Sequence, residues 1–226
     1  MKNKTAILVF ANSAEKQLTS KSNSSAQVFE LLIAKTLRIV KKTDLPYFYF
    51  PENKQVGKTF GERFKNAIEA VYDKGFKNVI SVGTDIPHLT SSHILKAESK
   101  LKQNDFVLGP STDGGFYLMG FTKNHFGKLS FLDLSWESNA LQRNLKTKLQ
   151  QLNASFSYLE TLSDLDEASD IKLILQSFRQ LSKHLKKILS TIQDTLNSIS
   201  DVILFHLEII FCKLYFNKGS PVLLHI

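Results

Sequence analysis

The stretch that decides the fold is Val79–Thr90, which reads VISVGTDIPHLT. Its apolar beginning is typical of a buried strand, and the strand pattern stops at a Gly-Thr-Asp turn before a helix-like segment. This order predicts that Asp85 lies at the carboxyl end of a strand. Ligands of open α/β sheets bind at that edge. Asp85 is therefore the first candidate site residue.

The rest of the chain alternates between strand-like and helix-like patterns. The strand-like runs are 5–11, 46–50, 78–83, 106–109, 116–121 and 155–159. The helix-like runs are 24–40, 59–74, 91–103, 137–152 and 166–175. Alternation at this spacing predicts βαβ units and a mainly parallel sheet covered on both faces. The predicted fold class is therefore α/β, a three-layer sandwich with a C-terminal helical extension.

The pattern changes after about residue 177. We expect an α/β domain over residues 1–177 and a helical extension over residues 178–226, which continues an apolar stripe and becomes more apolar toward its end. Its most apolar part, Ile199–Phe216, is interrupted by Asp201, Glu208 and Lys213. Stable membrane insertion is not expected, because a spanning helix needs about 20 mostly apolar residues. The extension is expected to pack on the domain or on a second copy, as in a homodimer.

Composition narrows the function classes only slightly. The chain has 226 residues and a formal net charge of +8, and its basic residues are scattered rather than gathered into one run. Scattered lysines are typical of a solvated surface, so no nucleic-acid partner is expected. One cysteine, Cys212, excludes an intrachain disulfide and favours a reducing compartment. With no signal-peptide pattern at the N-terminus, the expected location is cytoplasmic.

A second candidate carboxylate stands in the sequence Ser111-Thr112-Asp113-Gly114-Gly115. The two glycines allow the backbone to approach a ligand closely and to adopt positive φ. Asp113 could ligate a metal, orient a sugar hydroxyl or act as a base. The structural alternative is an ordinary Asp-Gly hairpin turn between the two flanking strands.

A third acidic element, Asp164-Leu165-Asp166, follows a predicted strand and precedes a helix. Asp164 or Asp166 could complete the ligand shell of Mg²⁺ or Mn²⁺, hard cations that prefer oxygen ligands. Capping of the following helix explains the same residues equally well. Arg63, at the start of another predicted helix, could pair with a phosphate, or it could be an ordinary surface arginine. Trp136 could stack on a base or a sugar, or simply pack in the core.

These elements, in this order, resemble a bacterial family of uncharacterised proteins, domain of unknown function 2064. Its members are regarded as glycosyltransferases. The matching pieces are ILVFA at 7–11, GER at 61–63, GTDIPHLT at 83–90, LGPSTDGGFYLMG at 108–120, LSW at 134–136 and DLD at 164–166. The resemblance covers roughly residues 4–175. It implies a Rossmann-like GT-A fold of the nucleotide-diphospho-sugar transferase type, with Asp85, Asp113 and Asp166 on the acidic positions of that superfamily.

The chain departs from the family after its first strand. The family usually carries a loop with Pro and Gly there, followed by Lys-Thr-Arg, whereas this chain reads ANSAEKQL at 11–18. A loop without glycine brings few backbone N–H groups to a phosphate. Lys16 could partly substitute for the missing arginine. The change weighs against a triphosphate-using nucleotidyltransferase and leaves open the loss of catalysis.

The leading hypothesis is a metal-dependent glycosyltransferase that uses a nucleotide-diphospho-sugar donor. In it, Asp85 and Asp166 hold Mg²⁺ or Mn²⁺, and Asp113 and Asp85 are the catalytic residues. Arg63, Lys16, Gly114 and Gly115 are expected to bind the nucleotide-linked substrate. The alternatives are a nucleotidyltransferase acting on a phosphorylated small molecule, and a non-catalytic protein with a degenerate nucleotide fold and a binding role.

Overall fold

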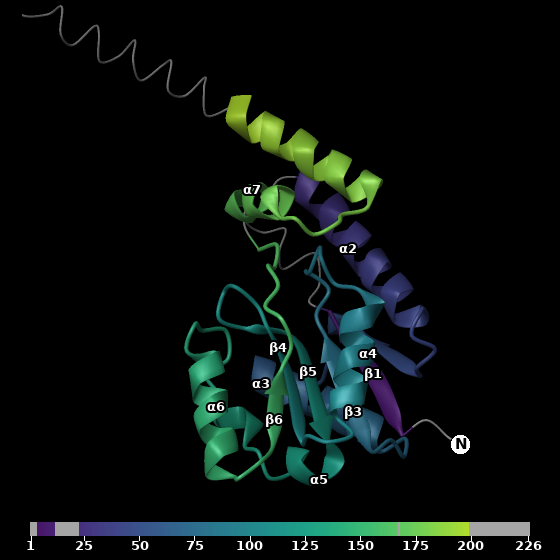
Figure 1. The fold of residues 1–226 in the computed structure, drawn as a ribbon, viewed down its shortest axis with the longest axis vertical. Helices are drawn as coiled ribbons and strands as arrows, with labels where there is room; N and C mark the ends of the chain where they lie inside the picture. Colours follow the sequence, from purple (N-terminus) through teal and green to yellow (C-terminus); the bar gives the residue numbers. More distant parts are fainter. Residues whose placement is uncertain (1–3, 12–22, 167, 199–226) are drawn as a thin grey trace, which may run out of the picture.

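A computed structural model describes residues 4–11, 23–166 and 168–198 of the chain (Figure 1). One six-stranded sheet forms its centre, with the strand order β2-β1-β3-β5-β4-β6. The strands are β1 (Thr5–Phe10), β2 (Tyr47–Phe50), β3 (Asn78–Val82), β4 (Phe106–Pro110), β5 (Phe116–Thr122) and β6 (Phe156–Tyr158). The helices are α2 (Asn23–Lys41), α3 (Phe60–Tyr72), α4 (Ser91–Lys100), α5 (Lys123–Phe126), α6 (Leu141–Gln151) and α7 (Ala168–Gln176).

The sheet is mostly parallel. β1 pairs in parallel with β2 and β3, and β4 pairs in parallel with β6. β5 runs antiparallel to both of its neighbours, β3 and β4, because the Asp-Gly-Gly turn folds it directly back from β4. The predicted α/β fold class is confirmed, with one reversed strand in the middle of the sheet.

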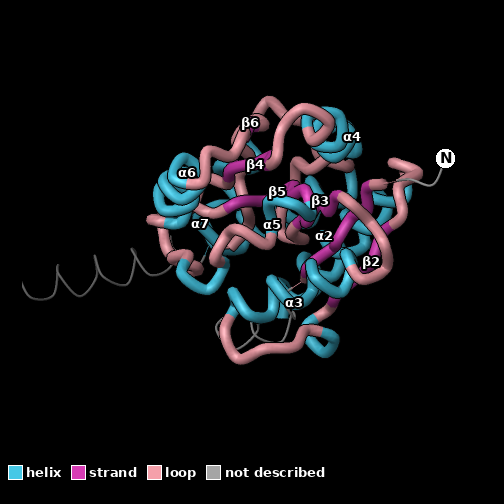
Figure 2. Tube along the Cα trace, turned by 90° about the horizontal axis from the view of Figure 1, so that it is seen from below, coloured by secondary structure: helices cyan, strands magenta, loops and turns pink. Residues whose placement is uncertain are grey.

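Helices cover both faces of the sheet, which gives three layers (Figure 2). Alternate residues of β1 point to opposite faces: Ala6 and Leu8 join the core beneath α3 and α6, whereas Ile7 and Val9 join the core beneath α2 and α4. Every residue of β1 is buried, so both faces of this strand are covered. Burial on both sides explains why the strands of this sheet read as continuous apolar runs.

A third apolar cluster joins α2, α7 and a further helix over residues 183–198. Val28 and Leu32 of α2 pack there with Ile174 of α7 and with Leu185 and Leu189 of the last described helix. The expected packing of the C-terminal segment on the domain thus holds for residues 183–198, which lie against α2 and α7 in Figure 1. The expected apolar helix beyond residue 198 lies outside the described residues.

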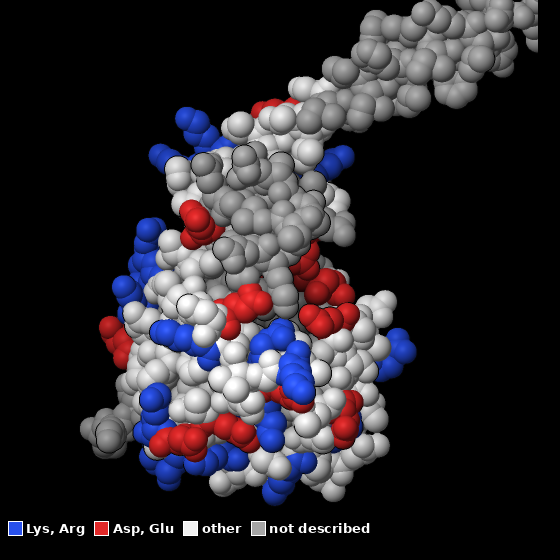
Figure 3. Space-filling model, turned by 180° about the vertical axis from the view of Figure 1, so that it is seen from behind, with Lys and Arg blue, Asp and Glu red and all other residues white. Residues whose placement is uncertain are grey.

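Within the described ranges, no helix combines the length and the apolar character needed to cross a bilayer. Lys and Arg side chains on the face in Figure 3 are interspersed with Asp and Glu rather than joined into one basic patch. This distribution agrees with the scattered lysines of the sequence.

Lys35 of α2 ties this helix to the loop that follows Asp85. Its ammonium group donates hydrogen bonds to the carbonyl oxygens of Pro87 and Leu89, the second at 3.4 Å. Burial lowers the pKa of Lys35 from 10.5 to about 8. In the same loop, burial and then the charge of Lys35 lower the pKa of His88 to about 4. The side chains of Ile86, His88 and Leu89 are buried, so this loop is packed away from solvent.

We expect the free energy of unfolding to rise with pH between about 8 and 9.5. In this window the folded protein has already begun to lose the Lys35 proton, whereas the unfolded chain keeps it up to pH 10.5. Each pH unit then adds at most about 1.4 kcal/mol. Urea unfolding across this pH range measures the slope. Lys35→Met should flatten it, and an unchanged slope in that variant would contradict the assignment.

Candidate functional site

Three acidic segments meet at one edge of the sheet because the strands before them run in the same direction. Asp85 follows β3, Asp113 follows β4, and Asp164 and Asp166 follow β6. Backbone contacts fix these segments to one another. Thr112 N donates to Leu162 O at 3.1 Å, and Leu165 N donates to Asp85 O at 3.0 Å. The carboxyl-end edge of the sheet thus carries four aspartates from three separate segments.

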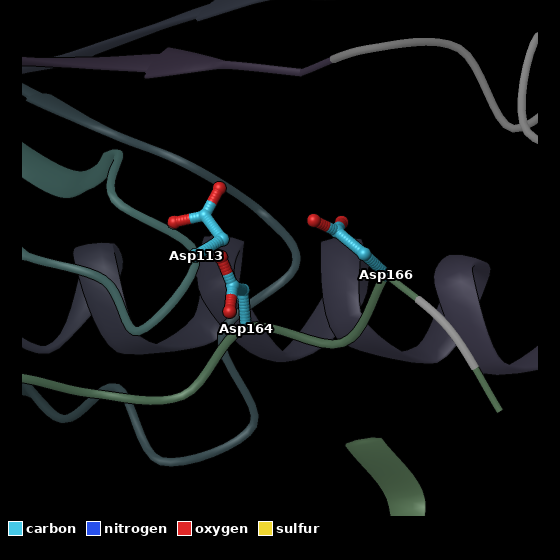
Figure 4. Close-up of side chains that lie close together, drawn as sticks. All are labelled: Asp113, Asp164 and Asp166. Atoms are coloured by element: carbon cyan, nitrogen blue, oxygen red, sulfur yellow. The ribbon is translucent and has the colours of Figure 1, made fainter. Parts of the chain in front are cut away.

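Three of these aspartates form a tight cluster, shown in Figure 4. Asp113, Asp164 and Asp166 each offer one carboxylate oxygen within 4.8 Å of the others. Asp164 is buried, whereas Asp113 and Asp166 are exposed. Three carboxylates at this separation are a donor set suited to a hard divalent cation.

The hydrogen bonds around the cluster give its members different protonation behaviour. Partial burial alone would raise the pKa of Asp113, but hydrogen bonds from Ser111 Oγ at 2.5 Å and Gly115 N at 2.8 Å lower it below the usual value. Burial, followed by the proximity of Asp113, raises the pKa of Asp164 to about 7. Asp164 also accepts a hydrogen bond from Thr112 Oγ1 at 3.2 Å. Of Asp113 and Asp164, it is therefore Asp164 that binds a proton more readily.

Asp85 lies beside this cluster without belonging to it. Burial, then the negative charge of Asp166 and more weakly that of Asp113, raises the pKa of Asp85 to about 6. Its carboxylate faces Gly83 closely: a Cβ added to that glycine would lie 3.0 Å from Asp85 Oδ1. Perturbed carboxyl groups facing one cavity are typical of functional sites.

All four aspartates line a single cavity of about 430 Å³. Its other walls include the aromatic side chains Phe10, Phe60, Phe64, Phe116, Tyr117 and Trp136. A rim of polar residues, Glu137, Ser138 and Asn139, continues from Trp136. Among the described residues that line the cavity, none is Lys or Arg. A cavity of this size accommodates a small-molecule ligand.

The structure brings most of the predicted site residues together. Asp85, Asp113, Asp166 and Gly115 line the cavity. Gly114 lies in the same turn at φ +97, where an added Cβ would be 2.8 Å from the Cα of Asn139. The Asp-Gly-Gly segment is therefore both a hairpin turn and part of the cavity wall.

The two predicted cationic residues are placed differently. Arg63 does not line the cavity: its guanidinium lies 6.0 Å from the centroid of the Phe60 ring, and Nη1 is 3.5 Å from Lys58 O. Its neighbour Phe64 takes the cavity-facing position of α3 instead. Lys16 lies outside the described residues. Phosphate binding by either residue stays a prediction.

The geometry gives Asp164 a larger role in the acidic cluster than the sequence predicts. Asp164 was only an alternative to Asp166, yet it is the most buried member of the cluster. The signal that distinguishes it is the short parallel bridge between Ser111 and Leu162, which continues the pairing of β4 with β6. This bridge carries Asp164 against the turn that holds Asp113, a contact that spacing along the chain does not reveal.

Gly114→Ala should destabilise the fold more than Gly75→Ala. Both glycines have positive φ, which costs other residues about 1–2 kcal/mol. An added Cβ at Gly75 meets nothing within 4 Å, so that variant measures the backbone cost alone, whereas the contact with Asn139 adds to it at Gly114. Urea unfolding of both variants provides the comparison, and equal losses would show that the approach of Asn139 is unimportant.

Comparison with known proteins finds a matching family model. A family model described as "Uncharacterized protein conserved in bacteria (DUF2064)" matches residues 48–138, which include Asp85, Asp113 and Trp136. The resemblance to DUF2064 is confirmed. No curated protein matches the chain in sequence.

A solved structure confirms the fold over most of the chain. A Desulfovibrio desulfuricans protein, provisionally described as a nucleotide-diphospho-sugar transferase, is 20% identical with a TM-score of 0.72, and the alignment covers 85% of this chain and 98% of that one. At that identity the likeness establishes the fold alone.

Two more distant structures also match. A Mycobacterium tuberculosis protein solved in complex with manganese is 12% identical with a TM-score of 0.44, over 78% of this chain and 100% of that one. The 4-diphosphocytidyl-2C-methyl-D-erythritol synthase of Anaerococcus prevotii is 10% identical with a TM-score of 0.47, over 87% and 97%.

Proposed function

We propose that the chain is a metal-dependent glycosyltransferase that uses a nucleotide-diphospho-sugar donor. The observation that carries this proposal is the convergence of Asp113, Asp164 and Asp166 on one cavity with Asp85. The fold supports it, since its well-matched structural neighbour is provisionally described as a transferase of this class. The aromatic wall supports it as well, because a cavity for phosphate alone needs no such surface.

The donor set fits a divalent cation such as Mg²⁺ or Mn²⁺. Asp113, Asp164 and Asp166 would hold it through carboxylate oxygens, the ligand type that both ions prefer. When bound, the cation supplies positive charge that stabilises a diphosphate leaving group. Without the cation, burial and then the proximity of Asp113 raise the pKa of Asp164 and so favour its protonated form. Of the sequence-based metal ligands, Asp85 and Asp166, this assignment keeps Asp166, leaves out Asp85 and adds Asp113 and Asp164.

Asp85 is not one of these proposed ligands, so its carboxylate is available to act on the substrate. With its pKa raised to about 6, its carboxylate is ionised at neutral pH yet basic enough to accept a proton from an acceptor hydroxyl. Its backbone is fixed by the hydrogen bond that its carbonyl oxygen accepts from Leu165 N at 3.0 Å. We assign Asp85 the role of general base and Asp113 the dual role of metal ligand and contact to the transferred sugar.

We also propose roles for the predicted residues that lie outside the acidic cluster. Arg63 and Lys16 would add positive charge near the phosphates, and Gly114 and Gly115 would allow the turn to approach the donor. Residues 178–226 form the proposed helical extension, through which a homodimer would assemble. The proposed location is cytoplasmic.

The test is a thermal-shift panel followed by a transfer assay. Nucleotides and nucleotide sugars are added with and without Mn²⁺, and a ligand of the native state raises the melting temperature by mass action. The proposal expects a nucleotide sugar with Mn²⁺ to stabilise the protein more than inorganic phosphate with Mn²⁺. Release of pyrophosphate from a nucleoside triphosphate would favour nucleotidyl transfer instead. Stabilisation without turnover in any combination would favour a non-catalytic binding role.

A further inference from the structure

The indole ring of Trp136 is held rigidly on the cavity wall. Its Nε1 donates a hydrogen bond to Phe131 O at 2.6 Å. The ring rests on Gly61 of α3 so closely that an added Cβ would lie 2.6 Å from Nε1. Ring centroids of Phe60 and Phe64 lie 5.0 Å and 5.3 Å away. The indole thus has one fixed orientation before any ligand arrives.

Packing and hydrogen bonds connect the segment that carries Trp136 to the turn that carries Asp113. The backbone of Asn139, three residues after Trp136, packs against Gly114 of the Asp113 turn. Gln142 Nε2 donates to Ser111 O at 3.0 Å and to Gly115 O at 2.8 Å, which clamps the start of α6 to the same turn. The distance between the indole and the carboxylates is therefore set by packing rather than by a mobile loop.

Polar residues follow Trp136 along the cavity wall. Glu137, Ser138 and Asn139 are exposed and line the cavity beside Trp136. Glu137 has a φ of +57, a left-handed conformation that is uncommon for residues other than glycine. Such strain is retained where the surrounding structure over-determines it, commonly at ligand sites. Here it turns the chain so that three consecutive polar side chains follow the indole along the cavity.

We propose that Trp136 is the stacking surface for the sugar ring of the donor, an inference that rests on the proposed function. A sugar ring presents an apolar C–H face and a rim of hydroxyl groups. The indole matches the face, and the carboxylate of Glu137 and the amide of Asn139 match the rim. A nucleobase would use the flat surface too, but it has fewer polar groups to satisfy around its edge.

The experiment uses the intact chain and the fluorescence of its single tryptophan. Because Trp136 is the only tryptophan, selective excitation reports on this ring alone. The protein in Mg²⁺ is titrated with nucleoside diphosphates and with the corresponding nucleotide sugars, while thermal shift on the same samples records binding independently. We expect the nucleotide sugar to change the emission clearly more than the diphosphate with the same base.

Two other outcomes overturn the inference. An equal change with both ligands would mean that the base, not the sugar, stacks on the indole. Binding by thermal shift with no change in emission would mean that Trp136 only packs. Absence of binding by every nucleotide sugar is a different result, which rejects the proposed function itself and the inference with it.

Variants separate stacking from core packing. Trp136→Leu should weaken nucleotide-sugar binding about tenfold, and Trp136→Phe should weaken it less because an aromatic face remains. Affinity for the nucleoside diphosphate should change less than twofold in a folded variant. If both ligands lose affinity equally, the ring acts through the fold, and the stacking role is rejected.

Discussion

Asp164→Asn is expected to abolish the metal-dependent rise in melting temperature. In the unaltered protein, Mn²⁺ at about one hundred times its dissociation constant adds about 2.7 kcal/mol to the free energy of unfolding. For a chain of this length that corresponds to a shift of about 5–10 °C. Asp164 supplies the buried carboxylate of the cluster, so an amide there removes a charged ligand and leaves the turn packed.

The same variant is expected to be more stable than the unaltered protein when no metal is added. Burial and Asp113 raise the folded-state pKa of Asp164 from 3.8 to about 7. The folded state therefore binds this proton more tightly than the unfolded chain does, and stability falls as pH rises from about 4 to about 7. Removal of the charge should restore on the order of 1–2 kcal/mol at pH 7.5.

Asp133→Asn is the matched control, because Asp133 is exposed and lies outside the cavity. Its melting temperature and its response to Mn²⁺ should equal those of the unaltered protein. If Asp164→Asn kept the full response to Mn²⁺, the three-carboxylate site would be wrong. If it lost stability without metal, the cost assigned to the buried charge would be wrong.

Asp85→Asn is expected to lower the rate of glycosyl transfer about 100- to 1000-fold while most of the Mn²⁺-induced stabilisation remains. A positioned general base contributes about that factor, and an amide cannot accept the proton. Asp85 lines the cavity but lies outside the cluster of three carboxylates, so the cation keeps its ligands. Initial rates at saturating donor, together with melting curves, measure both effects.

The pH profile of transfer is the companion readout. In the unaltered protein the rate should rise with pH as Asp85 loses its proton, at or below pH 6, because a bound cation lowers the pKa of about 6 that the metal-free carboxyl has. In Asp85→Asn the remaining, lower rate should no longer rise with pH in this range. A variant that loses the Mn²⁺ response as completely as Asp164→Asn would instead make Asp85 a metal ligand, as the sequence alone suggested.

The sequence predicted the fold because its strands are buried on both faces. The run Ala6–Phe10 has no polar position to obscure it, and Ser81 alone interrupts the run Val79–Val82. The runs of β3 and β4 each lead into a segment with glycine and aspartate, so the edge that carries Asp85 and Asp113 was also readable. The reversed direction of β5 follows from its short connection to β4.

Contacts between distant segments were less predictable. The helix expected from Glu137 begins only at Leu141, because Glu137 adopts a left-handed conformation and Asn139 packs on Gly114. The choice between Asp164 and Asp166 depended on a single bridge between segments 51 residues apart. Arg63 illustrates a third limit: one position along a helix separates the cavity-facing Phe64 from a side chain turned toward Lys58.

The most direct measurement of the central claim is anomalous diffraction from crystals of the protein soaked in Mn²⁺. The account predicts a manganese peak among the carboxylates of Asp113, Asp164 and Asp166, and its loss in crystals of Asp164→Asn. A peak held elsewhere, or no peak on these carboxylates at a manganese concentration that stabilises the protein, would contradict it.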